Sequence, residues 1–484
     1  MAQTINTNIQ SLNAQRNLTT SQSALSTSLQ RLSSGLRINS ARDDAAGLAI
    51  AERFTSQIRG LNQAQRNAND GVSLAQTAEG ALASAGDILQ RLRELAVQSS
   101  NATNSASDRQ ALQSEAGQLV SELDRVAQTT SFNGQKLLDG TLGTLTFQIG
   151  ANANESILAS GTNFRTNNYG DNRVAGNGVA VVAATNVVAA QAVTVAGYLG
   201  TGVYTTTATD TAKSIAAGVN GVTAKTGVTA YARTDVNLAL GVEAYSFSIK
   251  SDNTVAQTVS FTVGGTATTA DDYATALTAI NSAASKTGVT AQFDATNGGI
   301  TLSNASGNDI VITNGATANV LFNVDTLKAD GTKLAAPFDA KGAAAVATAN
   351  GRVILDSQQS FKVTDAGSGL VIGGSSTLQS VSSLDVTTYN NAQLAIAIVD
   401  SGLAIVNGQR AQYGALQSRF SSTISNLATT SENVSASRSR IQDADFAQET
   451  ANLTRNQILQ QAGIAMLAQA NALPNQVLTL LRGY

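Results

Sequence analysis

Residues 458–481 read ILQQAGIAMLAQANALPNQVLTLL, a stretch that contains no charged side chain. Apolar or small residues recur there at steps of three and four, which predicts a single apolar stripe along a helix. The stripe consists of Leu459, Ala462, Met466, Ala470, Leu473, Val477 and Leu480. Gln and Asn fill the other faces, so the stretch is too polar for a membrane span. It predicts a helix that is buried against other helices.

The first part of the chain mirrors this last part. From Ile5 to Leu36 the apolar residues again follow helical spacing, and the first charge is Arg16. The heptad-like spacing of both arms predicts that they pair as a coiled coil. Two ordinary amphipathic helices folded on a globular body would show the same spacing, so that alternative stays open. The weak apolar stripe predicts that each arm folds fully only against a partner.

The composition limits the classes of function. Of the 484 residues only 4% are aromatic and 13% are charged, with a net charge of −3, so nothing favours nucleic acid or an anionic membrane as a partner. The chain has no Cys and no His, which excludes thiolate chemistry, Cys-ligated metals and a His-based Ser triad. We therefore expect no enzyme, no cofactor and no metal site.

Targeting signals are also missing from the sequence. The segment Met1–Gln10 has neither a basic region nor an apolar core, so no cleavable signal peptide is predicted. No run approaches the roughly 18 apolar residues of a membrane span, and we expect no membrane insertion.

Three more helices are predicted, and they come from both ends of the chain. Apolar spacing predicts helices over Ile58–Leu92, over Leu112–Val126 with its entry at Ser107-Asp108, and over Leu394–Ile441. Alternation over Leu142–Ile149 predicts a strand or hairpin. The two ends therefore build one discontinuous helical body, and the residues between them form an insertion.

The insertion, Arg165–Tyr389, is rich in Ala, Gly, Thr and Val and has short alternating runs, which predict strands. The hexamer KTGVTA occurs at 225–230 and again at 286–291. Each copy follows a short helical pattern, over Thr211–Val219 and Asp271–Ala284. We therefore expect a repeated unit of helix, turn and strand in one or two small α+β domains.

Several ordered motifs in both end regions closely resemble bacterial flagellin, the filament protein of the flagellum. They lie at 32–47, 67–72, 76–82, 90–97, 436–445, 457–463 and 477–482. Residues 279–291 resemble the IN module of flagellins and hook-associated proteins. The fold expected is a mainly α-helical discontinuous body, with a long-helix bundle and a terminal coiled coil built from both chain ends, and an inserted β-rich α+β outer region.

The resemblance implies three domains and a structural function. The domains are 1–45 with 445–484 as a terminal coiled-coil filament core, 46–164 with 390–444 as a helical bundle with a β-hairpin in an outer tube, and 165–389 as surface-exposed α+β modules. The chain is expected to polymerise into the helical filament for motility, with folding of the termini coupled to assembly. A filament-associated adhesin or a hook–filament junction protein is the alternative.

The same resemblance implies the partners and the location. These are other copies of the chain, an export chaperone, the filament cap and hook-associated proteins, and host innate immune receptors, for an extracellular filament exported by the flagellar type III apparatus. The expected subunit-packing residues of the arms are Ile5, Ile9, Leu12, Leu25, Leu29, Leu32, Leu459, Met466, Leu473, Val477 and Leu480. Toll-like receptor recognition is implied at Arg91, Leu95 and Glu115, and inflammasome recognition at Val477, Leu478, Leu480 and Leu481.

Overall fold

The computed structural model describes residues 7–183, 186–315, 317–334 and 337–483, except for the side chains of 473–482. The chain divides into two compact units, and the long helices α2 and α8 each pass from one unit to the other. The first unit holds Met1–Gln76, Thr144–Ala159 and Ala415–Tyr484, and the second holds Thr77–Gly143 and Ser160–Gly414. The three domains predicted from the sequence stay a prediction.

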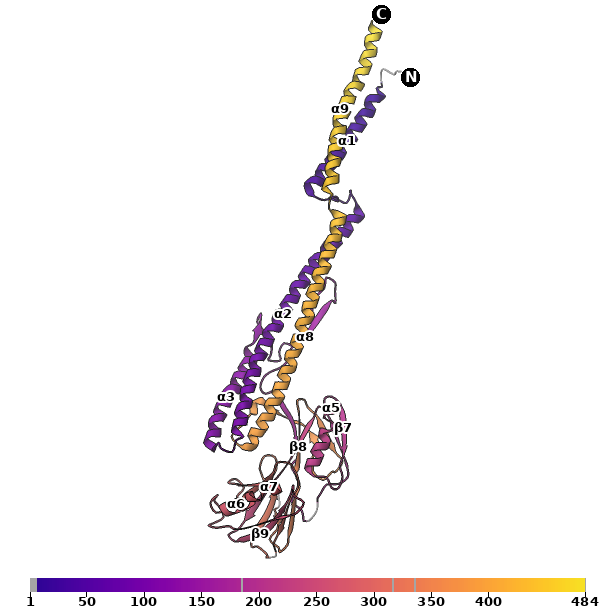
Figure 1. Ribbon diagram of the computed structural model, residues 1–484. Helices are drawn as coiled ribbons and strands as arrows, with labels where there is room; N and C mark the ends of the chain where they lie inside the picture. The colour runs from indigo at the N-terminus through magenta and orange to yellow at the C-terminus, as the bar shows by residue number, and fades with distance from the viewer. Residues whose placement is uncertain (1–6, 184–185, 316, 335–336, 484) are drawn as a thin grey trace. The chain divides into compact units, whose positions relative to one another are not determined.

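Within the described residues, five helices come from the two ends of the chain. They are α1 (Ile9–Ser34), α2 (Ala45–Ser99), α3 (Ala106–Thr129), α8 (Tyr389–Gln442) and α9 (Phe446–Arg482). In the first unit α1 packs along α9, as Figure 1 shows in indigo and yellow. This pairing joins the first and last helices of the chain, and the prediction of a helical body built from both ends is confirmed.

The ends of these helices follow local hydrogen bonding. The Asn8 side chain accepts the Ser11 N–H at the start of α1, and Gly35 ends this helix at a positive φ of 70°. The start of α3 was predicted at Ser107-Asp108 but lies two residues earlier. There Ser105 and Asp108 form a reciprocal capping box, which satisfies two backbone N–H groups.

Two short hairpins accompany the helices. The strands β1 (Ser131–Phe132) and β2 (Gln135–Lys136) pair through the turn Asn133-Gly134, in which both residues have positive φ. The strand β3 (Thr144–Gln148) confirms the strand predicted over Leu142–Ile149, and it forms a hairpin with β4 (Ser156–Ser160), which lies outside the predicted stretch.

The described residues of the insertion form three sheets. The largest has the order β11-β12-β8-β17-β5-β20, with β14 paired to β8 and β15 to β14. Its strands are β5 (Gly170–Ala175), β8 (Thr229–Leu240), β11 (Val289–Phe293), β12 (Ile300–Asn304), β14 (Phe322–Thr326), β15 (Phe338–Asp339), β17 (Arg352–Ser357) and β20 (Thr377–Ser380). The 3-10 turn η1 (Val381–Ser383) then leads toward α8.

The other two sheets have four strands each. One has the order β10-β9-β13-β16, from β9 (Ala244–Lys250), β10 (Gln257–Thr262), β13 (Ile310–Asn314) and β16 (Val346–Ala349). The other has the order β19-β18-β6-β7, from β6 (Ala192–Ala196), β7 (Thr201–Thr205), β18 (Lys362–Asp365) and β19 (Gly374–Ser375).

The repeated unit predicted from the hexamer is present twice. In the first copy α4 (Ala212–Asn220) and α5 (Thr223–Thr226) lead into β8, and in the second α6 (Ala274–Ser282) and α7 (Ala284–Thr287) lead into β11. Both hexamers place their glycine in the left-handed region after the short second helix.

Each copy lies beside its own hydrophobic core. Figure 1 labels α5 and β7 in one lobe of the insertion and α6, α7 and β9 in the other. Side chains on one face of the long strand β8 belong to both cores, because residues two apart point to the same side of a strand. Ala230 and Ala232 belong to the first core, whereas Val236, Leu238 and Leu240 belong to the second.

Candidate assembly surface

The most buried side chains in the seam between α1 and α9 are small or polar. Among the described residues of the two helices, the buried ones are Ser11, Ser28, Glu449 and Ala470. The Ser11 hydroxyl donates to the Asn471 side-chain oxygen at 2.8 Å. Residue numbers rise along α1 while those of their partners fall along α9, so the helices run antiparallel.

The large apolar side chains of the arms mostly point away from this seam. Ile9 is 60% exposed, Ile464 is 53% exposed and Met466 is 65% exposed. The other exposed large apolar residues of the arms are Leu12, Leu29, Phe446, Ile458 and Leu459. Ile464 and Met466 are two residues apart and therefore lie on different sides of α9, so these exposed apolar side chains are available to more than one neighbouring helix.

The residues predicted for subunit packing therefore differ in their exposure to solvent. Ile9, Leu12, Leu29, Leu459 and Met466 are exposed, and Leu25 and Leu32 are half-buried. Ile5 lies outside the described residues, and so do the side chains of Leu473, Val477, Leu478, Leu480 and Leu481. The sequence interpretation missed the seam residues Ser11, Ser28 and Glu449. Glu449 could have been noticed, because it is the only acidic residue in either arm helix.

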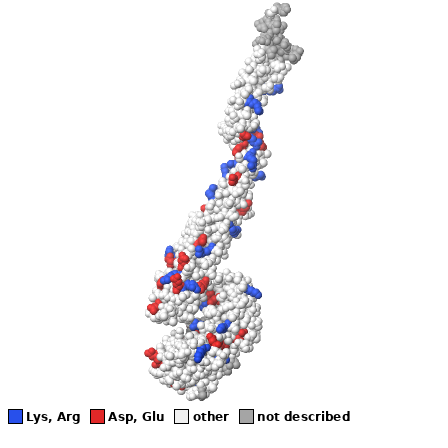
Figure 2. Space-filling model, viewed as in Figure 1, with Lys and Arg blue, Asp and Glu red and all other residues white. Residues whose placement is uncertain are grey.

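The linkers below the arms are joined by backbone hydrogen bonds. Leu36 and Asp443 form an isolated antiparallel bridge, and the Arg37 N–H donates to the Gln442 carbonyl at 2.7 Å. Figure 2 shows few blue or red atoms over α1 and α9 and many over the region of these linkers. Hydrogen bonds from Ser40 and the backbone at Asn39 lower the pKa of the Asp43 carboxyl, so it favours its charged form there.

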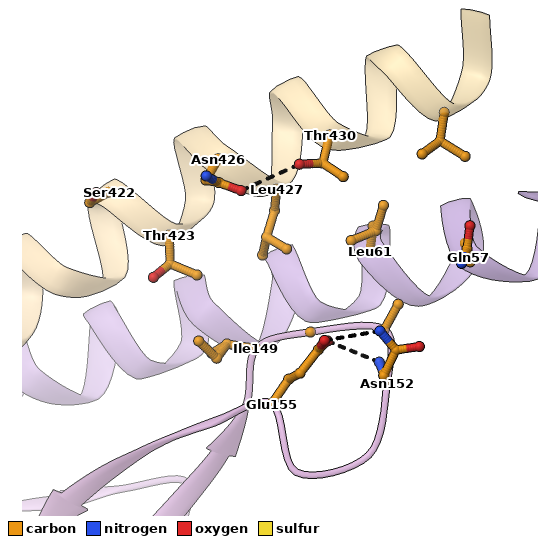
Figure 3. Close-up of a pocket in the computed structure, with 13 residues that line it drawn as sticks. Gln57, Leu61, Ile149, Asn152, Glu155, Ser422, Thr423, Asn426, Leu427 and Thr430 are labelled. Atoms are coloured by element: carbon orange, nitrogen blue, oxygen red, sulfur yellow. Dashed lines mark hydrogen bonds between the residues drawn. The ribbon is translucent and has the colours of Figure 1, made fainter. Parts of the chain in front are cut away.

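A pocket of about 540 Å³ lies in the first unit, where the loop between β3 and β4 faces α2 and α8. Figure 3 shows Leu61 and Leu427 on the helices and Asn152 and Glu155 on the loop. The Glu155 carboxylate accepts the Asn152 backbone N–H and its side-chain amide, which lowers the pKa of Glu155. The Glu155 carboxylate is therefore already hydrogen-bonded within the loop between β3 and β4.

The residues predicted for Toll-like receptor recognition lie in the second unit. The Arg91 guanidinium donates to the Glu115 carboxylate at 2.8 Å and to Glu94 at 2.9 Å, and all three side chains are exposed. Leu95, in contrast, is fully buried. The structure thus brings Arg91 and Glu115 together on the surface and places Leu95 in the core.

A buried acid holds the insertion against α8. Asp171 on β5 is fully buried, and the Ser401 hydroxyl on α8 donates to it at 3.3 Å. Its neighbour Arg173 binds Asp356 with two hydrogen bonds of 2.7 and 2.8 Å and lies 3.5 Å from Asp171. Burial, and then the negative charge of Asp356, raise the pKa of Asp171 to about 8.

Neither a metal cluster nor a membrane helix is found in the described part of the chain. There, no group of three or more His, Cys, Asp or Glu residues could hold a metal ion. In the same part of the chain, no helix is long and apolar enough to cross a membrane.

Three family models match the chain. The model of the bacterial flagellin N-terminal helical region matches residues 5–142, and that of the C-terminal helical region matches 396–481. The model of the flagellin hook IN motif matches residues 192–253. The IN match therefore covers the first repeated unit, whereas the sequence interpretation placed the resemblance at the second.

Curated relatives match over the full length. The chain is similar to a B-type flagellin of Pseudomonas aeruginosa, with 46% identity and 100% of both chains covered. It is also similar to flagellin A of Vibrio anguillarum, with 36% identity, and to a flagellin of Salmonella choleraesuis, with 38% identity, and both matches cover 100% of both chains. A solved structure of FliC from Burkholderia pseudomallei matches with 20% identity and a TM-score of 0.31, covering 72% of this chain and 99% of that one.

Proposed function

Because the chain belongs to the bacterial flagellin family and is a structural subunit of the flagellar filament, we propose that the exposed apolar faces of α1 and α9 pack between neighbouring subunits. The observation that carries this proposal is the exposure of Ile9, Ile464 and Met466 on helices whose own seam is already closed. These side chains lose contact with water only when a further helix covers them. Folding of the arms is then completed by assembly.

The proposal is tested by elongation of filament seeds. Asp in place of Ile464 puts a charge in the proposed contact, whereas Met in its place keeps an apolar side chain. Burial of such a side chain contributes roughly 1.5–3 kcal/mol, so Ile464→Asp should raise the critical subunit concentration about ten- to hundredfold. The Ile464→Met variant should elongate seeds almost as the unmodified chain does.

The measurement is the filament length seen by electron microscopy after sonicated seeds are mixed with folded subunits. Circular dichroism of each subunit before mixing checks that the helical body is intact. Normal elongation by Ile464→Asp would show that this face does not pack between subunits. Failure of the unmodified chain to elongate seeds would favour a junction protein or adhesin over a bulk filament subunit.

Export and its partners form a second part of the proposal. As a component of the extracellular filament, the subunit leaves through the flagellar type III apparatus. A cytoplasmic chaperone covers the apolar face of the C-terminal arm until export, and the cap and hook-associated proteins contact the arms at the filament ends. The exposed Ile458, Ile464 and Met466 support the need for such a cover. No catalytic activity is assigned to the chain.

Recognition by host receptors is proposed at two places. Arg91 and Glu115 form an exposed charged pair for a Toll-like receptor, and the buried Leu95 holds α2 in position. Val477, Leu478, Leu480 and Leu481 are proposed for inflammasome receptors. Arg91→Ala should lower receptor signalling by the monomer without changing its helical content, and unchanged signalling would remove Arg91 from the contact.

A further inference from the structure

Polar contacts near both ends of the seam tie α1 to α9 in one antiparallel register. Near one end the Asn8 side-chain amide donates to the Ala470 carbonyl at 2.8 Å, and the Ser11 hydroxyl donates to Asn471. At the other end an Arg31 nitrogen lies 3.9 Å from a Glu449 carboxylate oxygen. Because Asn8 and Arg31 are 23 residues apart and their partners Ala470 and Glu449 are 21 residues apart, one alignment of the two helices satisfies both contacts together.

The midpoint of the seam agrees with the same alignment. A side chain added at Gly463 would place its Cβ atom 3.3 Å from Leu18 Cδ1 and 3.9 Å from Leu18 Cβ. Leu18 and Gly463 therefore face each other between the two sets of polar contacts. The register is constant along the described seam.

The Arg31–Glu449 pair distinguishes this register from others. Glu449 is only 7% exposed, and it is the sole acid in α1 and α9. A slip by one heptad would bring Glu449 opposite Ala24 and bury its carboxylate without a cation, which is strongly unfavourable. Packing alone discriminates poorly between registers, because the other buried side chains of the seam, Ser11, Ser28 and Ala470, are small.

We propose that Arg31 and Glu449, with the contacts of Asn8 and Ser11, fix the register of α1 against α9. The register decides which apolar side chains of the two arms lie beside one another on the outer surface. This inference rests on the proposed packing of that surface between subunits. The polar seam is then a positioning device for assembly, and buried polar groups are known to act in this way in coiled coils.

Disulfide trapping tests the register directly, since the chain has no other cysteine. Leu18→Cys with Gly463→Cys places two Cβ atoms within the range of about 3.5–4.5 Å that a disulfide needs. Leu18→Cys with Asn456→Cys, one heptad away, is the matched out-of-register pair. Each pair is introduced into the full chain, incorporated into filaments with an excess of unmodified subunits, oxidised, and read on a non-reducing gel.

The charges of Arg31 and Glu449 are then reversed, first one and then both, in the chain that carries each cysteine pair. We expect Arg31→Glu to lower the yield of the in-register disulfide by at least about fivefold, because it places two acids together in a buried seam. Adding Glu449→Arg to Arg31→Glu should restore the yield, since the pair is again of opposite sign. A purely structural loss at position 31 would not be rescued by the second change.

Two results would overturn the inference. One is an in-register yield that Arg31→Glu leaves unchanged, and the other is a double reversal that cross-links no better than the single one. The unmodified chain reports separately on the proposed function, because its elongation of seeds does not depend on the cysteine pairs. If seeds elongate normally but the charge reversals leave the disulfide yields unchanged, the proposed packing between subunits stands. Only the proposal that Arg31 and Glu449 fix the register is then wrong.

Discussion

Gly71 on α2 is a position where the addition of one methyl group should lower the stability of the fold. A Cβ atom added there would lie 2.6 Å from Phe420 Cζ, and the Phe420 ring is fully buried against Phe147 at 5.4 Å between ring centroids. Gly71→Ala should therefore overpack this contact and lower the free energy of unfolding by about 1–3 kcal/mol. Urea unfolding followed by circular dichroism measures the change.

Gly80 on the same helix is the matched control. No atom lies within 4 Å of a Cβ added there, and the position is exposed. Gly80→Ala should raise the free energy of unfolding by about 0.5–1 kcal/mol, because Ala loses less backbone entropy in a helix. Equal effects at both positions would mean that helix propensity, not contact with Phe420, governs Gly71.

Asp171 predicts a pH dependence of stability. Its pKa is raised to about 8 in the folded chain from an ordinary value of 3.8, so the folded state binds this proton more tightly than the unfolded state. This tighter proton binding contributes to the free energy of unfolding. The contribution is fully present below about pH 4 and is lost as the pH rises through about 8, at no more than about 1.4 kcal/mol per pH unit. Arg173, Asp356, Tyr231 and Ser401 surround the group.

The comparison that isolates this proton is with Asp171→Asn, which keeps an uncharged polar side chain. The difference in unfolding free energy between the two proteins, measured by urea titration from pH 4 to 9, should change steadily with pH in favour of the variant. A difference that stays constant over this range would show that Asp171 is ionised in the folded chain.

Within elements, the repeated units of the insertion each depend on one asparagine. The Asn281 amide donates to the Ala291 carbonyl at 3.0 Å and accepts the Ala291 N–H at 2.8 Å, and Asn220 does the same with Ala230. These paired bonds hold each helix against the strand that follows it. The hexamer repeat predicted helix, turn and strand, but not this clamp.

Asn281→Ala should destabilise the lobe that contains α6 and β11. The change leaves the backbone N–H and C=O of the buried Ala291 without these partners, at a cost of about 1–3 kcal/mol. Hydrogen exchange at Ala291 should accelerate, while exchange at Ala230 stays as before. Asn220→Ala is the reciprocal control, and acceleration at both residues by either variant would mean that the two lobes unfold together.

For the whole molecule, the insertion should be removable because its entry and exit lie side by side. The Val381 N–H donates to the Tyr169 carbonyl at 3.1 Å, and Gly170 pairs with Ser380 in the sheet. Replacing residues 170–380 by two glycines should leave the helices folded and seeded elongation intact, since the arms are unchanged. Loss of α-helical circular dichroism in this variant would show that the insertion is needed for folding of the helical body.

The amino-acid sequence by itself determined the elements and their faces. Spacing of three and four residues placed α1, α2, α8 and α9, and alternation placed the strands, because these periods follow from the backbone geometry of each element. It also indicated that both ends of the chain belong to one helical body.

Only the tertiary structure decided which faces meet. The apolar stripes were expected to join the arms, yet three of the four buried residues of the seam, Ser11, Ser28 and Glu449, are polar. Among the described stripe residues Ala470 is buried, Leu25 and Leu32 are half-buried, and Ile9 and Met466 are exposed. Strand order, with β17 between β8 and β5, was likewise beyond the sequence. The physical reason is that periodicity reports how much of a face is apolar, whereas pairing depends on contacts between residues that are hundreds of positions apart.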